Sequence, residues 1–185
     1  STKINDICKG AEELVNAIKN KIPIIIYGDY DVDGISSTAI MFDFIYHEIG
    51  YTKIFPYIPK RKGEGYGISD NSMNSISSIV KDKFSFDVFE SKVKPLVISV
   101  DCGIKDVELI DGKWHEWFDF IITDHHDIPK NEEFNNLVSI KAKAIIHPRH
   151  DNSSIDFKDV CGAAVTYKFI EVVNSIGKFE ANIQK

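Results

Sequence analysis

The chain has few cysteines and no long apolar run. Its three cysteines, Cys8, Cys102 and Cys161, lie too far apart to match the spacing of a zinc motif. An odd number of scattered cysteines also argues against a disulfide framework and favours reduced thiols, as in the cytoplasm. No uninterrupted apolar run approaches the roughly 20 residues that a membrane-spanning helix needs. We therefore expect no membrane partner.

An excess of basic residues is also missing. The 185 residues carry a formal net charge of −6 at pH 7, which argues against a protein that coats nucleic acid by bulk charge. An enzyme that meets phosphate through metal ions and a local basic patch stays compatible with this charge. The apolar fraction of 43% is typical of a single domain with a real core. The first residue is Ser1, not Met, so we expect an excerpt of a longer chain.

Short apolar runs alternate with helical patterns along the chain. Buried-type runs predict strands at 22–27, 53–58, 96–100, 118–123 and 142–146. Apolar residues at helical spacing predict helices at 4–19, 35–49, 69–80 and 160–176, with a shorter one that ends at Gly112. Pro56 places its strand near an edge, and residues 81–94 allow no assignment. The alternation predicts a Rossmann-like α/β fold, a mostly parallel sheet of about five strands with helices on both faces.

Acidic residues and histidines follow these strands. Asp29, Asp31 and Asp33 come after the first strand, where an extended backbone would point all three the same way. Like charges this close repel one another, and a hard divalent cation with oxygen ligands would relieve the repulsion. Because ligands bind beyond the carboxyl ends of strands in open α/β sheets, we expect one shared pocket. The other strands lead into Asp101, into the segment 124–126 and into His147.

Carboxylates with imidazoles suit Mn²⁺ or Mg²⁺, and Zn²⁺ less well, since no cysteine is spaced to help. Two ions that share a carboxylate would activate a water and neutralise phosphoryl oxygens. Asp101 could reach between both ions, and one histidine could bind metal while the other donates to phosphate. Each element alone has a simpler reading: a turn or lone Ca²⁺ loop at 29–34, a helix cap at Asp101, structural histidines. Their joint occurrence at successive strand ends disfavours those readings.

Three segments together resemble the first three motifs of the DHH phosphoesterases: GDYDVDG at 28–34, VDCGI at 100–104 and TDHH at 123–126. Residues 58–67 (IPKRKGEGYG) and 160–165 (VCGAAV) are similar to segments of the RecJ-type exonucleases in this family. The resemblance covers nearly the whole chain. It implies a divalent-metal-dependent 5′-to-3′ exonuclease of DNA repair and recombination, which acts on single-stranded DNA and can meet replication or repair proteins.

The resemblance also implies a role for each matching residue. Asp31 and Asp33 match the Asp-x-Asp metal ligands, and Asp101 matches the ligand that bridges two Mn²⁺ or Mg²⁺ ions. His125 matches the metal-binding histidine and His126 the catalytic histidine that faces the phosphate, with Asp124 orienting their turn. Many relatives place a further histidine where this chain has Tyr27, and Asp29 would then supply the missing ligand.

Residues that would handle the substrate are less distinct. Arg61 lies in a glycine-rich basic loop as a candidate for bidentate phosphate contact. Tyr66 could stack on a base, and Arg149 follows a strand end and could face the pocket. A solvated loop explains Arg61 equally well, and Tyr66 could instead simply pack against the protein.

One departure from the family concerns its fourth motif, an Asp beyond the last predicted helix that completes a metal site. Neither this motif nor the DHH-associated domain is present, so we expect residues 1–185 to be a truncated DHH catalytic domain with an incomplete metal site. Two alternatives stay open. One is a DHH hydrolase of oligoribonucleotides, cyclic dinucleotides or pyrophosphate, which the segments 65–67 and 161–163 disfavour. The other is a non-catalytic DHH binding module, which the intact motifs disfavour.

Overall fold

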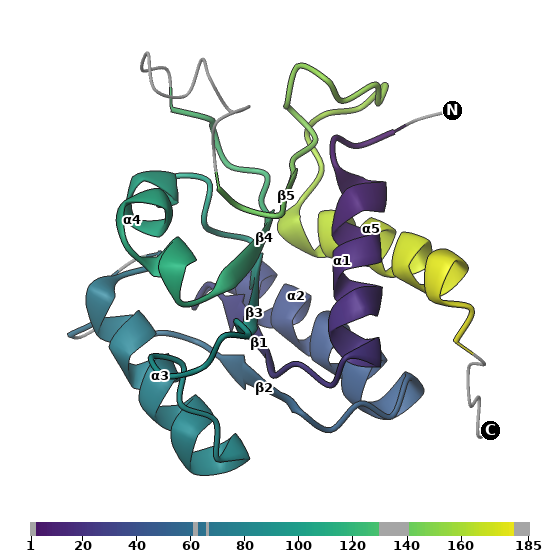
Figure 1. Cartoon of the computed structure of the whole chain (residues 1–185). Helices are drawn as coiled ribbons and strands as arrows, with labels where there is room; N and C mark the ends of the chain where they lie inside the picture. The colour runs from purple at the N-terminus through teal and green to yellow at the C-terminus, as the bar shows by residue number, and fades with distance from the viewer. Residues whose placement is uncertain (1–2, 61–62, 66, 130–140, 180–185) are drawn as a thin grey trace.

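A computed structural model describes residues 3–60, 63–65, 67–129 and 141–179 (Figure 1). Its strands are β1 (Ile24–Gly28), β2 (Ile54–Tyr57), β3 (Leu96–Val100), β4 (Asp119–Thr123) and β5 (Ala144–Ile146). Its helices are α1 (Ile7–Lys19), α2 (Val32–Phe42), α3 (Asp70–Phe84), α4 (Val107–Gly112) and α5 (Gly162–Gly177). A π-helical turn (Asp43–Glu48) extends α2, and a 3₁₀ turn (Trp114–Glu116) follows α4.

All five strands are parallel and form one sheet in the order β2-β1-β3-β4-β5. The predicted α/β class is therefore confirmed. Pro56 lies in β2, which is an edge strand as its proline indicated. An edge strand tolerates proline because one side of its backbone needs no partner.

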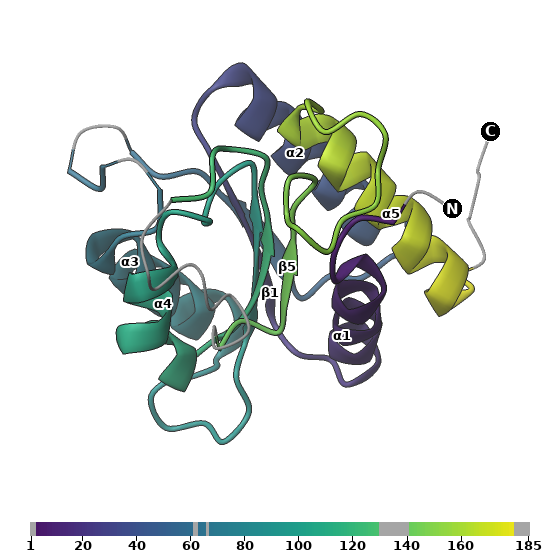
Figure 2. The same ribbon diagram turned by 90° about the horizontal axis from the view of Figure 1, so that it is seen from above.

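Helices cover both faces of the sheet (Figure 2), with α1, α2 and α5 on one face and α3 and α4 on the other. Side chains of β1 alternate between the two cores. Ile24 and Ile26 pack toward α1, α2 and α5, whereas Ile25 and Tyr27 pack toward α3 and α4. A strand buried on both faces explains why its sequence is an unbroken apolar run rather than an alternating one.

The strand order fixes where a ligand can bind. The chain leaves β1 toward α2 on one face and leaves β3 toward α4 on the other, so the topology reverses between these neighbouring strands. The register aligns the ends of four strands: Gly28 pairs with Val100, and Thr123 pairs with both Val100 and Ile146. The residues that follow these strand ends, Asp29, Asp101, Asp124 and His147, therefore leave the sheet side by side.

The bounds of two helices, α2 and α3, differ from prediction. Helix α2 begins at Val32, not at residue 35, because the Asp31 carboxylate accepts a hydrogen bond from the Gly34 N–H at 2.9 Å and caps the helix. The expectation of an extended run from Asp29 to Asp33 is therefore wrong, since Asp33 lies in the first turn of α2. Helix α3 has the predicted cap, Ser69, and continues past residue 80 to Phe84.

None of the helices in the described part of the chain is both long enough and apolar enough to cross a lipid bilayer.

Candidate metal centre

Five of the predicted residues converge beyond the ends of β1, β3 and β4. Ligand atoms of Asp29, Asp31 and Asp101 lie within 4.8 Å of one another, and so do those of Asp101, His125 and His126. Asp101 belongs to both groups. A carboxylate shared by two ligand groups is the arrangement expected of a residue that contacts two metal ions.

Asp101 is buried, with 1% of its surface exposed. Its backbone is left-handed (φ 62°), and its N–H donates to the Thr123 carbonyl at 3.0 Å. Neither carboxylate oxygen has a hydrogen-bond partner among the described residues. His125 Nε2 lies 3.0 Å from Oδ1, but not in hydrogen-bonding orientation. Burial, together with the charges of Asp33 and Asp31, raises the Asp101 pKa to about 8.

A buried carboxylate without partners is costly, and a cation removes that cost. The donor set around Asp101, carboxylate oxygens with two imidazoles, matches the preferences of Mn²⁺ and Mg²⁺. The residues present therefore fit the predicted metal.

Asp124 holds the turn that carries both histidines. Its Oδ1 accepts hydrogen bonds from the backbone N–H groups of His125 (2.7 Å) and His126 (3.0 Å) and from His126 Nδ1 (2.8 Å). Its Oδ2 accepts from the Ile104 N–H at 2.9 Å. Burial works to raise the Asp124 pKa, but the hydrogen bonds from His126 and Ile104 outweigh it, and the pKa is lowered. The bond to Asp124 in turn raises the pKa of His126 and favours the imidazolium.

Asp33 lies beside these ligand groups, but its carboxylate binds the start of α5. Its two oxygens accept hydrogen bonds from the backbone N–H groups of Gly162 (2.6 Å) and Ala163 (2.8 Å), in the first turn of α5. The positive end of a helix favours such a carboxylate. Asp33 Oδ2 also lies 3.6 Å from His125 Nε2, although Asp33 is in neither converging ligand group. Its role as a metal ligand stays a prediction.

Gly162 permits this close approach of α5. A Cβ at this position would lie 2.3 Å from Asp101 Oδ1, which no real contact allows. The glycine in the segment 160–165 was the available sequence signal, yet the contribution of the α5 N–H groups was not predicted. Their partner Asp33 is too distant in sequence for any local pattern to indicate the pairing.

Tyr27 lies away from the centre. Its hydroxyl donates to the Gly67 carbonyl at 2.6 Å and contacts Ser72 Oγ at 3.0 Å, on the α3 side of the sheet. Burial raises the Tyr27 pKa, so the phenol stays neutral. This side chain anchors the segment before α3, and Asp29 is the carboxylate that the β1 end contributes instead.

Of the three predicted substrate residues, the structure describes Arg149. Arg61 and Tyr66 lie outside the described residues. The Arg149 guanidinium donates to Asp127 Oδ1 at 2.6 Å and to Asp159 Oδ1 at 3.0 Å. Arg149 thus links the loop after β4 to the segment before α5, and its contact with phosphate stays a prediction.

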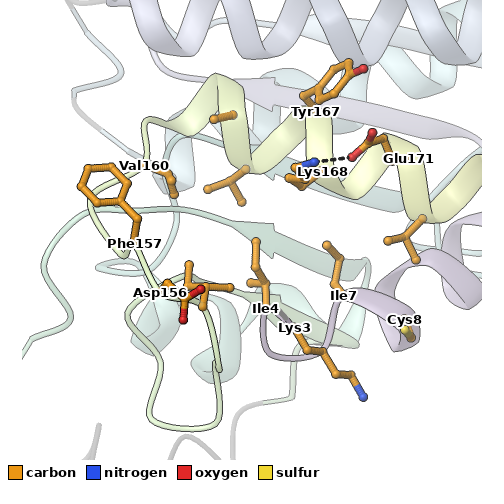
Figure 3. A pocket seen from close by; sticks show the side chains of 14 residues that line it. Lys3, Ile4, Ile7, Cys8, Asp156, Phe157, Val160, Tyr167, Lys168 and Glu171 are labelled. Carbon is orange, nitrogen blue, oxygen red and sulfur yellow. Dashed lines mark hydrogen bonds and ion pairs between the residues drawn. The ribbon is translucent and has the colours of Figure 1, made fainter. Parts of the chain in front are cut away.

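A cavity of about 720 Å³ lies between α1, the segment 155–160 and α5 (Figure 3). Its lining is largely apolar and includes Ile4, Ile7 and Phe157, with the ion pair between Lys168 and Glu171 at one side (2.7 Å). None of the described carboxylates and imidazoles of the centre lines this cavity. The cavity is therefore not the place of the metal chemistry.

Comparisons with known proteins show which proteins the chain is similar to. The chain is 32% identical over 160 residues to the single-stranded-DNA-specific exonuclease RecJ of Bacillus subtilis, which covers 86% of this chain and 18% of the relative. The RecJ of Escherichia coli is 26% identical over 165 residues, 89% of this chain and 25% of the relative. The chain thus spans a quarter or less of these relatives.

The fold is similar to that in a crystal structure of exonuclease RecJ bound to manganese, with a TM-score of 0.72 at 23% identity over 97% of this chain and 40% of that one. Residues 23–185 match the family described as "DHH family, N-terminal domain". This match extends over most of the chain and includes all three motifs. The chain therefore belongs to the DHH family.

Proposed function

We propose that the chain carries the catalytic centre of a divalent-metal-dependent phosphodiesterase, a 5′-to-3′ exonuclease specific for single-stranded DNA in repair and recombination. The observation that carries this proposal is Asp101, a buried carboxylate that accepts no hydrogen bond from the described residues and lies where two ligand groups meet. The names of the similar proteins of Bacillus subtilis and Escherichia coli support single-stranded DNA as the substrate. The free thiols support a reducing compartment, the cytoplasm.

Asp29, Asp31, Asp101 and His125 would hold the ions, with Asp33 beside them. When bound, Mn²⁺ or Mg²⁺ supplies an activated water and neutralises the oxygens of the phosphoryl group during in-line displacement. The ligand atoms of Asp101 and His125 lie within 4.8 Å of a ligand atom of His126.

His126 is the proposed catalytic donor. Asp124 binds its Nδ1 at 2.8 Å, fixes the ring and favours the imidazolium. An imidazolium can donate a hydrogen bond to a phosphate oxygen or a proton to the leaving oxygen. Asp124 itself stays ionised, because hydrogen bonds lower its pKa.

The test is a cleavage assay with Mn²⁺ on single-stranded DNA labelled at either end, made with a longer chain that includes the expected fourth motif, because an incomplete metal site would leave residues 1–185 inactive alone. We expect label release from the 5′ end first, little cleavage of the annealed duplex, and no cleavage by Asp101→Asn. Faster hydrolysis of dinucleotides, cyclic dinucleotides or pyrophosphate than of long DNA would favour a small-substrate hydrolase. Mn²⁺-dependent DNA binding without cleavage would favour a binding module. The expected lack of a fourth motif stays a prediction, tested by Mn²⁺ titration beside a longer chain.

A further inference from the structure

His147 is a buried histidine one residue beyond β5, with no exposed surface. The ring lies beside the turn of the metal centre: Nε2 is 2.8 Å from the His126 carbonyl oxygen. The other nitrogen, Nδ1, is 3.1 Å from the backbone nitrogen of Arg149. Both ring nitrogens are therefore engaged inside the protein.

These two contacts fix the tautomer of His147. A backbone N–H can only donate, so Nδ1 accepts from Arg149 and carries no proton. A carbonyl can only accept, so Nε2 carries the proton and donates it to His126. Burial lowers the His147 pKa, which agrees with a neutral ring.

The Asp124–His126 turn is thus held from two sides. Asp124 accepts from its backbone N–H groups, and His147 donates to the carbonyl at its end. His147 is itself fixed through its own carbonyl, which accepts from Ser153 Oγ at 2.7 Å. Ser153 Oγ in turn accepts from the Asn5 N–H at 2.8 Å. A chain of hydrogen bonds therefore connects the segment before α1 to the histidine turn.

We propose that His147 is a positioning residue of the metal centre, whose Nε2–H fixes the His126 carbonyl and so the orientation of both imidazoles of the turn. This inference rests on the proposed metal-dependent function. Groups that orient metal ligands change metal affinity when they are removed, without contacting the metal. His147 is such a group here; the sequence pattern placed it only at a strand end that leads to the shared pocket.

The test is Mn²⁺ binding by titration calorimetry to the whole chain. We expect His147→Leu, which removes both hydrogen bonds at similar volume, to lower Mn²⁺ affinity at least about tenfold. His147→Gln and His147→Asn keep a side-chain donor, and we expect at least one of them to restore affinity close to that of the unmodified chain. Ser153→Ala is the matched control: it breaks the same hydrogen-bond chain on the side away from the turn, so stability falls while Mn²⁺ affinity is kept.

A nitrogen-edited NMR spectrum of the unmodified chain adds a measurement that does not depend on any variant folding. The proposal requires a protonated Nε2 and an unprotonated Nδ1 in His147. The opposite tautomer, unchanged Mn²⁺ affinity in a folded His147→Leu, a loss that neither amide restores, or an equal loss in Ser153→Ala would each overturn it. Failure of both the unmodified chain and the longer chain with the fourth motif to bind Mn²⁺ would instead overturn the proposed function.

Discussion

The backbone N–H of Gly162 donates a 2.6 Å hydrogen bond to the Asp33 carboxylate, across 129 residues of sequence. The bond joins the first turn of α2 to the first turn of α5. It lies beside the buried Asp101, which a side chain at position 162 would displace. The first turn of α5 thus lines one side of the acidic centre.

Replacing Gly162 by Ala should disturb the packing of α5 against Asp101. The added Cβ would lie 2.3 Å from Asp101 Oδ1, so α5 and the carboxylate must separate, at a cost of about 1–3 kcal/mol. We expect a lower unfolding free energy in urea and weaker Mn²⁺ binding by calorimetry. Gly112→Ala is the control, because its Cβ would meet no atom within 4 Å. Equal effects of the two substitutions would contradict the close packing of α5 against Asp101.

Asp101→Asn should change how stability depends on pH. The folded pKa of Asp101, about 8, is above the unfolded value of 3.8. Its contribution to stability is therefore complete below pH 4 and is lost as the pH rises through 8. In EDTA, we expect Asp101→Asn to exceed the unmodified chain in unfolding free energy at pH 9 by on the order of 3 kcal/mol. Saturating Mn²⁺ should reverse that order. If the unfolding free energies of the two proteins depend on pH in the same way from pH 5 to 9, Asp101 is not a buried carboxylate without hydrogen bonds.

Arg149 gives a test of substrate contact that is separate from metal binding. Its guanidinium pairs with Asp127 and Asp159, both well exposed. We expect Arg149→Ala to weaken binding of single-stranded DNA about tenfold, and Asp127→Asn to strengthen it by releasing the guanidinium. Fluorescence anisotropy at several salt concentrations measures both. Unfolding free energy should change little, because exposed ion pairs contribute about 0–1 kcal/mol. Unchanged DNA affinity in both variants would leave Arg149 a purely structural link.

Ser69→Ala should destabilise the chain through α3 alone. Ser69 and Ser72 form a reciprocal capping box at the start of this helix. Loss of such a cap costs about 1 kcal/mol, and we expect that decrease in urea unfolding with Mn²⁺ affinity unchanged. Ser78→Ala, in an exposed position of the same helix, should be neutral or slightly stabilising. A Ser69→Ala variant as stable as Ser78→Ala would contradict the cap.

The fold could be predicted where sequence pattern and burial agree. The strand at 96–100 was predicted to the residue, because a buried apolar run ends at Asp101 and Gly103. Helix starts were harder to predict from the sequence than this strand. The predicted helix at 4–19 begins only at Ile7, since Asp6 is left-handed with φ 52°. Such a backbone choice depends on tertiary contacts, including the hydrogen bond from the Ile145 N–H to Asp6 Oδ2 at 3.3 Å.

The site could be predicted as a set of residues but not as an arrangement. Strand ends of a parallel sheet meet at one edge, which was enough to gather Asp29, Asp101 and the histidines. Two relationships were out of reach: the bond between Asp33 and α5, and the support of His126 by His147. Both join segments distant in sequence through backbone groups. Backbone groups are the same at every residue, so residue types alone carry no signal of such contacts.

The left-handed backbone at Asp101 has an evolutionary consequence. At φ 62° glycine, asparagine and aspartate are the residues that the chain tolerates without strain. Exchange of one oxygen for an amide nitrogen would thus remove the shared ligand while preserving the local shape. Descendants of such a chain could lose their metal chemistry in a single mutational step and survive as folded domains, free to be recruited for binding alone.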